Sequence, residues 1–189
     1  DDECLIGDDC RGSVSGVVLR NSRIHHNVDN GVRAYGEGLT IQDSEFHRNG
    51  SNQRGRHQLL VRCLEECRQL KILRNRFTDS SIDDDGNCRR SAIMIEGQVN
   101  GVTVEGNHID EGAGNAGSSC YGIQYATNHQ GREYALNLYL RGNTIKDVGS
   151  RGIALATCQN CLIENNVIIQ DRSGSFAALF FPDRGGIGD

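Results

Sequence analysis

Tryptophan is absent from this chain of 189 residues, and aromatic residues make up only 5% of it. A hydrophobic core must therefore be built mainly from aliphatic side chains. Proline is nearly absent as well, since Pro182 is the single example, whereas glycine occurs 24 times. The turns of such a chain are made by glycine and asparagine, which accept backbone conformations that most residues avoid.

Lysine is scarce: only Lys71 and Lys146 stand among 20 basic residues, and the net charge is −5. Without a basic stripe, nucleic acid is not expected as a partner. The preference for arginine has two interpretations, genome composition or recognition of carboxylates by the planar guanidinium group. No apolar run approaches the roughly 20 residues of a transmembrane helix, so no membrane span is expected.

The first residues include neither an initiator methionine nor an apolar signal segment, which is typical of a processed or trimmed chain. Eight cysteines are present, an even number that favours disulfides and an oxidising compartment. We therefore expect a secreted, periplasmic or cell-surface protein.

One short pattern recurs six times: two apolar residues separated by one residue, then a polar or small stretch, then a closing apolar residue. A Ser or Asn stands before the end of each copy, at positions 22, 44, 75, 107, 143 and 166. The gaps are 22, 31, 32, 36 and 23 residues, and a second strand with period-two alternation lies between copies. Constant strands with insertions of variable length at one corner are typical of a solenoid of β-strand coils. The recurrent Asn is expected at a corner in the left-handed conformation, with its side chains stacked as a ladder.

The segments GVTVEGNHID, NLYLRGNTIKD and CLIENNVIIQD resemble the pectin-lyase-like superfamily of right-handed parallel β-helix proteins, and the resemblance covers roughly residues 16–180. It implies an all-β fold, a single-stranded right-handed parallel β-helix (solenoid) of about six coils with loop insertions. We expect an N-terminal segment at 1–15, the β-helix domain at 16–181 and a C-terminal tail at 182–189.

In enzymes that this chain resembles, the substrate lies along a sheet face, so outward side chains of the second strands are the candidates. Alternation predicts that Val32, Ile93, Ile123 and Ile153 point inward. It predicts two outward columns: Arg33, Leu60, Met94, Gln124, Ala154 and Ala178, and Tyr35, Arg62, Glu96, Ala126, Ala156 and Phe180.

The polar members of these columns are the candidate site. Arg33 and Tyr35 are candidate catalytic residues, and Arg62, Glu96 and Gln124 are candidate substrate-binding residues, because two Arg and a Tyr suit an acidic sugar. The alternative for Arg62 and Glu96 is an ordinary ion pair between neighbouring coils.

Two further candidates lie outside the strands. His57 follows a long insertion and is a candidate general base. The run Asp83, Asp84 and Asp85 offers hard oxygen ligands for Ca²⁺, although a solvated acidic loop explains it equally simply. We interpret the other histidines as corner residues: His25, His26, His47, His108 and His129.

The cysteines fall at matching places in different coils. The spacing of Cys63 and Cys67, and of Cys158 and Cys161, suggests zinc, but three coils at about 4.8 Å each put the pairs roughly 14 Å apart. We predict local disulfides instead, together with a bridge between adjacent coils; the alternative is buried free thiols. The predicted pairs are Cys4–Cys10, Cys63–Cys67, Cys88–Cys120 and Cys158–Cys161.

Two functions are consistent with the sequence. The first is a secreted carbohydrate-active protein, a polysaccharide lyase or C5-epimerase acting on an acidic (uronate) glycan, with Ca²⁺ as the only expected cofactor. The signature motifs of pectin hydrolases and pectate lyases are absent, which weakens this reading. The second is a non-catalytic β-helix, a surface, adhesion or spike module. Because no capping helix is evident at either end, we also expect self-association or a longer parent chain.

Overall fold

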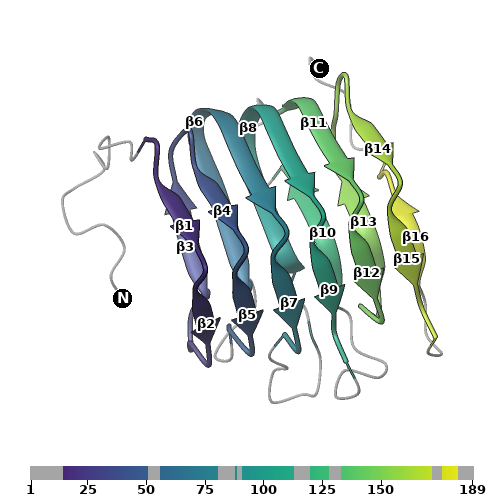
Figure 1. The fold of residues 1–189 in the computed structure, drawn as a ribbon. Helices are drawn as coiled ribbons and strands as arrows, with labels where there is room; N and C mark the ends of the chain where they lie inside the picture. Colours follow the sequence, from purple (N-terminus) through teal and green to yellow (C-terminus); the bar gives the residue numbers. More distant parts are fainter. Residues whose placement is uncertain are drawn as a thin grey trace.

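The computed structural model is a stack of parallel β-strands that wind around one axis (Figure 1). It describes residues 15–50, 56–80, 88, 91–112, 120–127, 133–171 and 176–182. Each strand pairs in parallel with its equivalent in the next coil, and the coils number about six, as the sequence predicts. No helix occurs in the described residues, and thus none there could cross a membrane. The boundaries of the flanking segments stay predictions.

Every coil passes in turn through three walls. The first wall contains β1 (Val18–Arg20), β4 (Thr40–Gln42), the last parts of β6 (Leu59–Leu73) and β8 (Ser91–Glu105), β11 (Ala135–Arg141) and β14 (Leu162–Glu164). The second wall contains β2 (Arg23–His25), β5 (Glu45–His47), β7 (Arg76–Thr78), β9 (His108–Asp110), β12 (Thr144–Lys146) and β15 (Val167–Ile169). The third wall contains β3 (Val32–Tyr35), the first parts of β6 and β8, β10 (Tyr121–Ala126), β13 (Arg151–Leu155) and β16 (Ala177–Phe180).

The long strands β6 and β8 join the third wall to the first. The sequence pattern predicts two separate strands in each place, but the structure has one strand of 15 residues that bends around the corner. In β6 the pairing register shifts between Cys63 and Cys67, and Gln69 has a φ of 56°. In β8, Gly97 and Gly101 have positive φ, which lets the strand turn without ending.

The core fills the space between the three walls with one stacked column of apolar side chains per inward position. Phe46 and Phe77 of the second wall stack with their ring centroids 4.7 Å apart, and both are buried. Inward positions of the third wall hold Leu59, Ile93 and Ile123, which also pair in register. The core is thus aliphatic with a few stacked rings, as the composition requires.

An asparagine ladder runs along the corner between the first and second walls. The side-chain Oδ1 atoms of Asn75, Asn107, Asn143 and Asn166 each accept the N–H of the equivalent residue one coil earlier, at 2.9–3.1 Å. The ladder is as predicted, but the left-handed conformation expected for it is wrong. Because the ladder side chain must reach inward to the next coil, the residue before it makes the turn, and these residues are Asn21, Asp43, Arg74, Gly106, Gly142 and Asn165.

Candidate functional site

The outward side chains of the third wall form the predicted columns over most of the stack. Arg33 lies beside Leu60, and Tyr35 lies beside Arg62. The last coil is the exception, because Phe180 and not Ala178 lies beside Ala154. A shift of two residues preserves the period-two pattern, so alternation alone does not fix the register of β16. The predicted places of Ala178 beside Ala154 and of Phe180 beside Ala156 are therefore wrong.

Three of the predicted residues meet on the first two coils. The guanidinium carbon of Arg33 lies 5.3 Å from the ring centroid of Tyr35, a cation–π arrangement. Tyr35 is 37% exposed, and its strand neighbour is Arg62. The Nε atom of Arg33 is buried and has no hydrogen-bond partner in the described part of the chain. We name Arg33, Tyr35 and Arg62 the arginine–tyrosine cluster.

Arg62 also forms the ion pair that the sequence offered as an alternative. Its Nε donates to the carboxylate of Glu96 at 2.8 Å, and the Glu96 side chain is only 6% exposed. Gln124, on the next coil, accepts a hydrogen bond from the Ser91 hydroxyl at 2.9 Å. All three candidate binding residues therefore have partners on neighbouring coils, and Glu96 presents little surface to a ligand.

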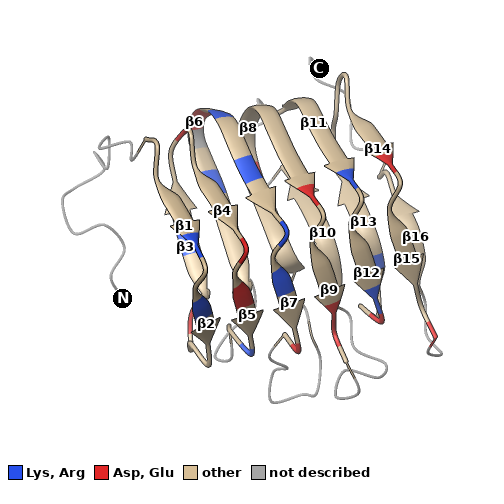
Figure 2. Cartoon of the chain, in the orientation of Figure 1, with Lys and Arg blue, Asp and Glu red and all other residues tan. Residues whose placement is uncertain are grey.

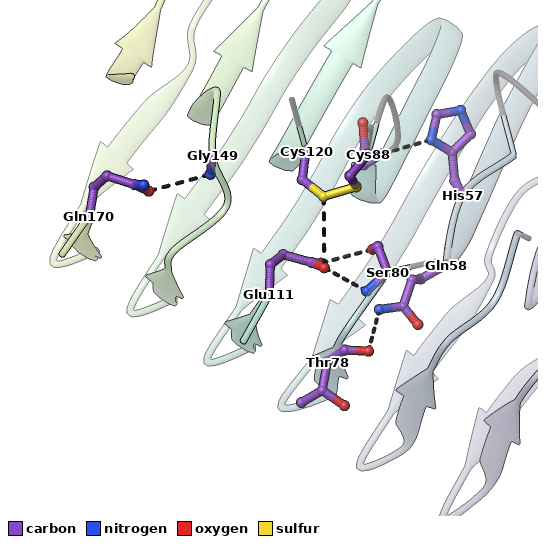
Figure 3. The surroundings of a disulfide bond; sticks show 10 residues. His57, Gln58, Thr78, Ser80, Cys88, Glu111, Cys120, Gly149 and Gln170 are labelled. Carbon is purple, nitrogen blue, oxygen red and sulfur yellow. Dashed lines mark hydrogen bonds between the residues drawn. A yellow bond between two sulfur atoms is a disulfide. The ribbon is translucent and has the colours of Figure 1, made fainter. Parts of the chain in front are cut away.

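His57 lies apart from the arginine–tyrosine cluster. It is buried at the start of the third wall, two residues before β6, and its backbone N–H donates to Oδ1 of Asn30. Its Nδ1 accepts the backbone N–H of Ser91 at 3.0 Å (Figure 3). Since Nδ1 already accepts a hydrogen bond, the ring joins two coils, and the structure does not bring it together with Tyr35.

The outward face of the middle coils is covered rather than open. Leu60, Met94 and Ala126 point away from the core, yet all three are buried and form a small second apolar cluster. Tyr125, on the inner side, is buried too, and its hydroxyl donates to the carbonyl of Gly97 at 2.7 Å. Burial raises the pKa of Tyr125, which keeps its phenol protonated. The accessible part of the predicted site is thus confined to the early coils.

Three of the predicted disulfides are present: Cys63–Cys67, Cys88–Cys120 and Cys158–Cys161. Every cysteine of the described residues is bonded, so the free-thiol alternative is wrong for these six. The three bonds indicate an oxidising, extracytoplasmic environment. The predicted Cys4–Cys10 pair, the Asp83, Asp84 and Asp85 run, and His129 lie outside the described residues.

A buried polar group next to one disulfide was not anticipated (Figure 3). The Glu111 carboxylate accepts both the backbone N–H and the hydroxyl of Ser80, at 2.5 and 2.8 Å, and lies 4.0 Å from the Cys120 sulfur. Both sulfurs and the carboxylate fall within the spacing of metal ligands. Because Cys88 and Cys120 are joined to each other, they are not thiolate ligands, and the group serves to hold adjacent coils together.

The histidines of the second wall were missed by the sequence reasoning. His25, His47 and His108 are strand residues that point outward, so their interpretation as corner residues is wrong; of the four described, His26 alone occupies a corner, with a φ of 56°. Strands of three residues are too short to show alternation, so these histidines resemble corner residues in the sequence.

The outward face of the second wall carries a charged side chain on most of its described strands. In Figure 2 the ribbon positions of Lys and Arg and those of Asp and Glu follow one another from β2 to β9. A surface depression of about 380 Å³ lies over its first three coils. Its lining includes Arg23, His25, His26, Glu45, His47 and Arg76.

Comparison with known proteins supports the architecture. A family model described as "Right handed beta helix region" matches residues 9–180. No curated protein and no solved structure gives a significant match. The parallel walls, the stacked core and the asparagine ladder agree with that family match, and the fold implies the pectin-lyase-like superfamily that the sequence resembles. The chain belongs to the family of proteins with a right-handed β-helix region.

Proposed function

We propose that this β-helix acts outside the cytoplasm on an acidic, uronate-containing polysaccharide held at the arginine–tyrosine cluster. The observation that carries the proposal is the Arg33 guanidinium, which stacks on an exposed Tyr ring while its buried Nε has no hydrogen-bond partner in the described residues. A buried donor without a partner calls for an explanation, and a movement of the Arg33 side chain that brings its guanidinium to a ligand carboxylate would supply one. The Tyr35 ring offers a flat surface for a sugar.

The proposed chemistry begins with removal of the C5 proton of a uronate. Arg33 neutralises the sugar carboxylate, so that the electron pair of the broken C5–H bond is stabilised. Tyr35 is the proposed base, because it is exposed beside Arg33, whereas His57 is buried and hydrogen-bonded elsewhere. In a lyase the C4–O bond then breaks as a C4–C5 double bond forms, and the departing oxygen takes up the proton that Tyr35 removed. In an epimerase a proton returns to C5 on the opposite face. We further propose Ca²⁺, held by Asp83, Asp84 and Asp85, as an aid to carboxylate binding.

The second candidate is a non-catalytic module of the cell surface or of a spike. It is favoured because Arg62, Glu96, Gln124 and His57 all have partners within the fold. It is also favoured by the end coils, where the inward-pointing Leu179 is 45% exposed. Such a surface suits self-association of stacked coils.

The decisive experiment incubates the protein with pectate, alginate and glycosaminoglycans, with Ca²⁺ or with a chelator. Ultraviolet absorbance of the unsaturated product reports a lyase, and NMR of the polymer reports an epimerase. We expect Tyr35→Phe to lower turnover on the order of 100-fold, and Arg33→Ala to weaken binding. The matched control is Tyr139→Phe on the first wall, which should change neither. Binding without turnover would favour the non-catalytic module, whereas neither binding nor turnover with any polymer would exclude the proposal.

A further inference from the structure

Three imidazoles converge at the depression on the second wall, on two adjacent coils. His25 ends β2, His26 follows it, and His47 of β5 pairs with His25 in register. The Nδ1 atoms of His25 and His26 lie 3.1 Å apart, and the ring centroids of His26 and His47 lie 5.4 Å apart. His25 and His26 are exposed and His47 is half-buried, so a ligand reaches them from solvent.

The separation of the two Nδ1 atoms matches the space between two ligands of one metal ion. With a metal–nitrogen bond of about 2.05 Å, two ligands stand about 3.3 Å apart in a tetrahedral site and about 2.9 Å apart at a right angle. The observed 3.1 Å lies between these values. In the metal-free protein one of the two nitrogens must donate a proton to the other. An ion that replaces this proton would bind both lone pairs after the two rings turn so that these lone pairs converge on it.

His47 can supply a third ligand after its side chain rotates. Its Nδ1 lies 3.0 Å from the Thr78 hydroxyl and 3.8 Å from the Asp79 carboxylate. A proton on Nδ1 donates to the Thr78 hydroxyl, and it leaves the lone pair on Nε2. Histidine ligands of metals usually have such a partner on their other ring nitrogen, because it fixes the tautomer. A rotation of the His47 side chain brings Nε2 towards the His25–His26 pair.

We propose that His25, His26 and His47 form a surface site for a late first-row divalent cation, Zn²⁺, Ni²⁺ or Cu²⁺. Imidazole nitrogen suits these ions, whereas Ca²⁺ and Mg²⁺ require oxygen ligands. The local charge is mixed: Glu45 pairs with Arg23 at 3.1 Å, and Arg76 adds a positive charge to the lining. The positive charge of Arg76 therefore repels the cation and keeps the expected affinity moderate. Removing this charge should increase the affinity, whereas removing a histidine should decrease it.

The experiment measures Zn²⁺ and Ni²⁺ binding by isothermal titration calorimetry on chelator-treated protein without a histidine tag. We expect His25→Gln and His26→Gln each to weaken binding at least ~10-fold, and His47→Gln to weaken it less, because that ring must move. The matched control is His108→Gln, two coils away on the same wall, which should leave binding unchanged.

Arg76→Gln should tighten binding several-fold, because it removes a repelling charge. All these side chains except His47 are exposed, and circular dichroism of each variant confirms that the fold is retained. Wild-type protein that binds neither metal would overturn the proposal. So would binding that His25→Gln and His108→Gln weaken equally. Neither readout depends on glycan activity, so this site and the arginine–tyrosine cluster succeed or fail separately.

Discussion

The second and third walls have the same architecture, but their outward side chains are used differently. On the third wall the ion pair of Arg62 and Glu96 is largely withdrawn from water, with the Glu96 side chain only 6% exposed. The corresponding pair on the second wall, Arg23 and Glu45, is 80% and 55% exposed. The outward side chains of the two walls therefore differ in solvent exposure, although the walls have the same architecture. Beyond the early coils, the outward polar side chains of the third wall are buried or paired within the fold. Those of the second wall are exposed and accessible to ligands.

The largest effect is expected from a glycine of the third wall. Gly97 has a φ of 92°, and a Cβ there would lie 1.9 Å from the backbone oxygen of Cys63. We expect Gly97→Ala to cost more than about 3 kcal/mol of unfolding free energy or to prevent folding. Gly142, which precedes the second wall, has a φ of 61° but nothing within 4 Å of the added Cβ. Gly142→Ala should therefore cost only roughly 1–2 kcal/mol.

Urea denaturation followed by circular dichroism measures both variants. If the two substitutions prove equally destabilising, left-handed backbone strain alone would account for them, and the close contact of the third wall with its neighbouring coil would lose its importance.

A smaller difference is expected between the two ion pairs. Arg62→Ala leaves the withdrawn Glu96 carboxylate without its 2.8 Å donor, which should cost about 3 kcal/mol. Arg23→Ala should change stability by less than about 0.5 kcal/mol, because its pair is solvated. Replacing Arg62 by Met and Glu96 by Leu together should recover much of the loss, since no charge is then left behind. A cost for Arg23→Ala as large as that for Arg62→Ala would remove the distinction between the walls.

The walls themselves were largely predictable from the sequence. The repeated apolar alternation, the ladder positions and the matching cysteines indicate parallel coils, because each requires equivalent residues to stack. Sequence periodicity did not predict two features of the walls. The register of β16 was ambiguous because a shift of two residues keeps Leu179 inward. The corner strands β6 and β8 were predicted in pieces because their bends are left-handed residues within a continuous ladder.

The candidate site was less predictable, because exposure depends on what neighbouring coils contribute. The columns correctly placed Tyr35 beside Arg62 and Arg62 beside Glu96. They gave no sign that Glu96 and His57 are buried, since the groups that hold them lie 27 to 34 residues away in the sequence. The His25–His26 pair was visible as adjacent letters, but its use as a site depends on a third ring from another coil.

The smallest effect is expected for a bidentate pair at the corner between the first and second walls. Arg74 donates to both carboxylate oxygens of Asp43 at 2.8 and 2.9 Å, and these hydrogen bonds lower the pKa of Asp43 below its usual value of 3.8. Because the folded pKa is depressed, the contribution is present above pH 3.8 and is lost as the pH falls through the folded pKa.

Asp43→Asn should therefore lower the urea midpoint slightly at pH 7 and converge with wild type in strong acid. In 1 M salt, where the Debye length is about 3 Å, the difference for the exposed Asp43 should shrink, while that for the withdrawn Arg62–Glu96 pair persists. Equal sensitivity of the two pairs to salt would show that the third wall is as open to solvent as the corner, and so would contradict the comparison of the walls.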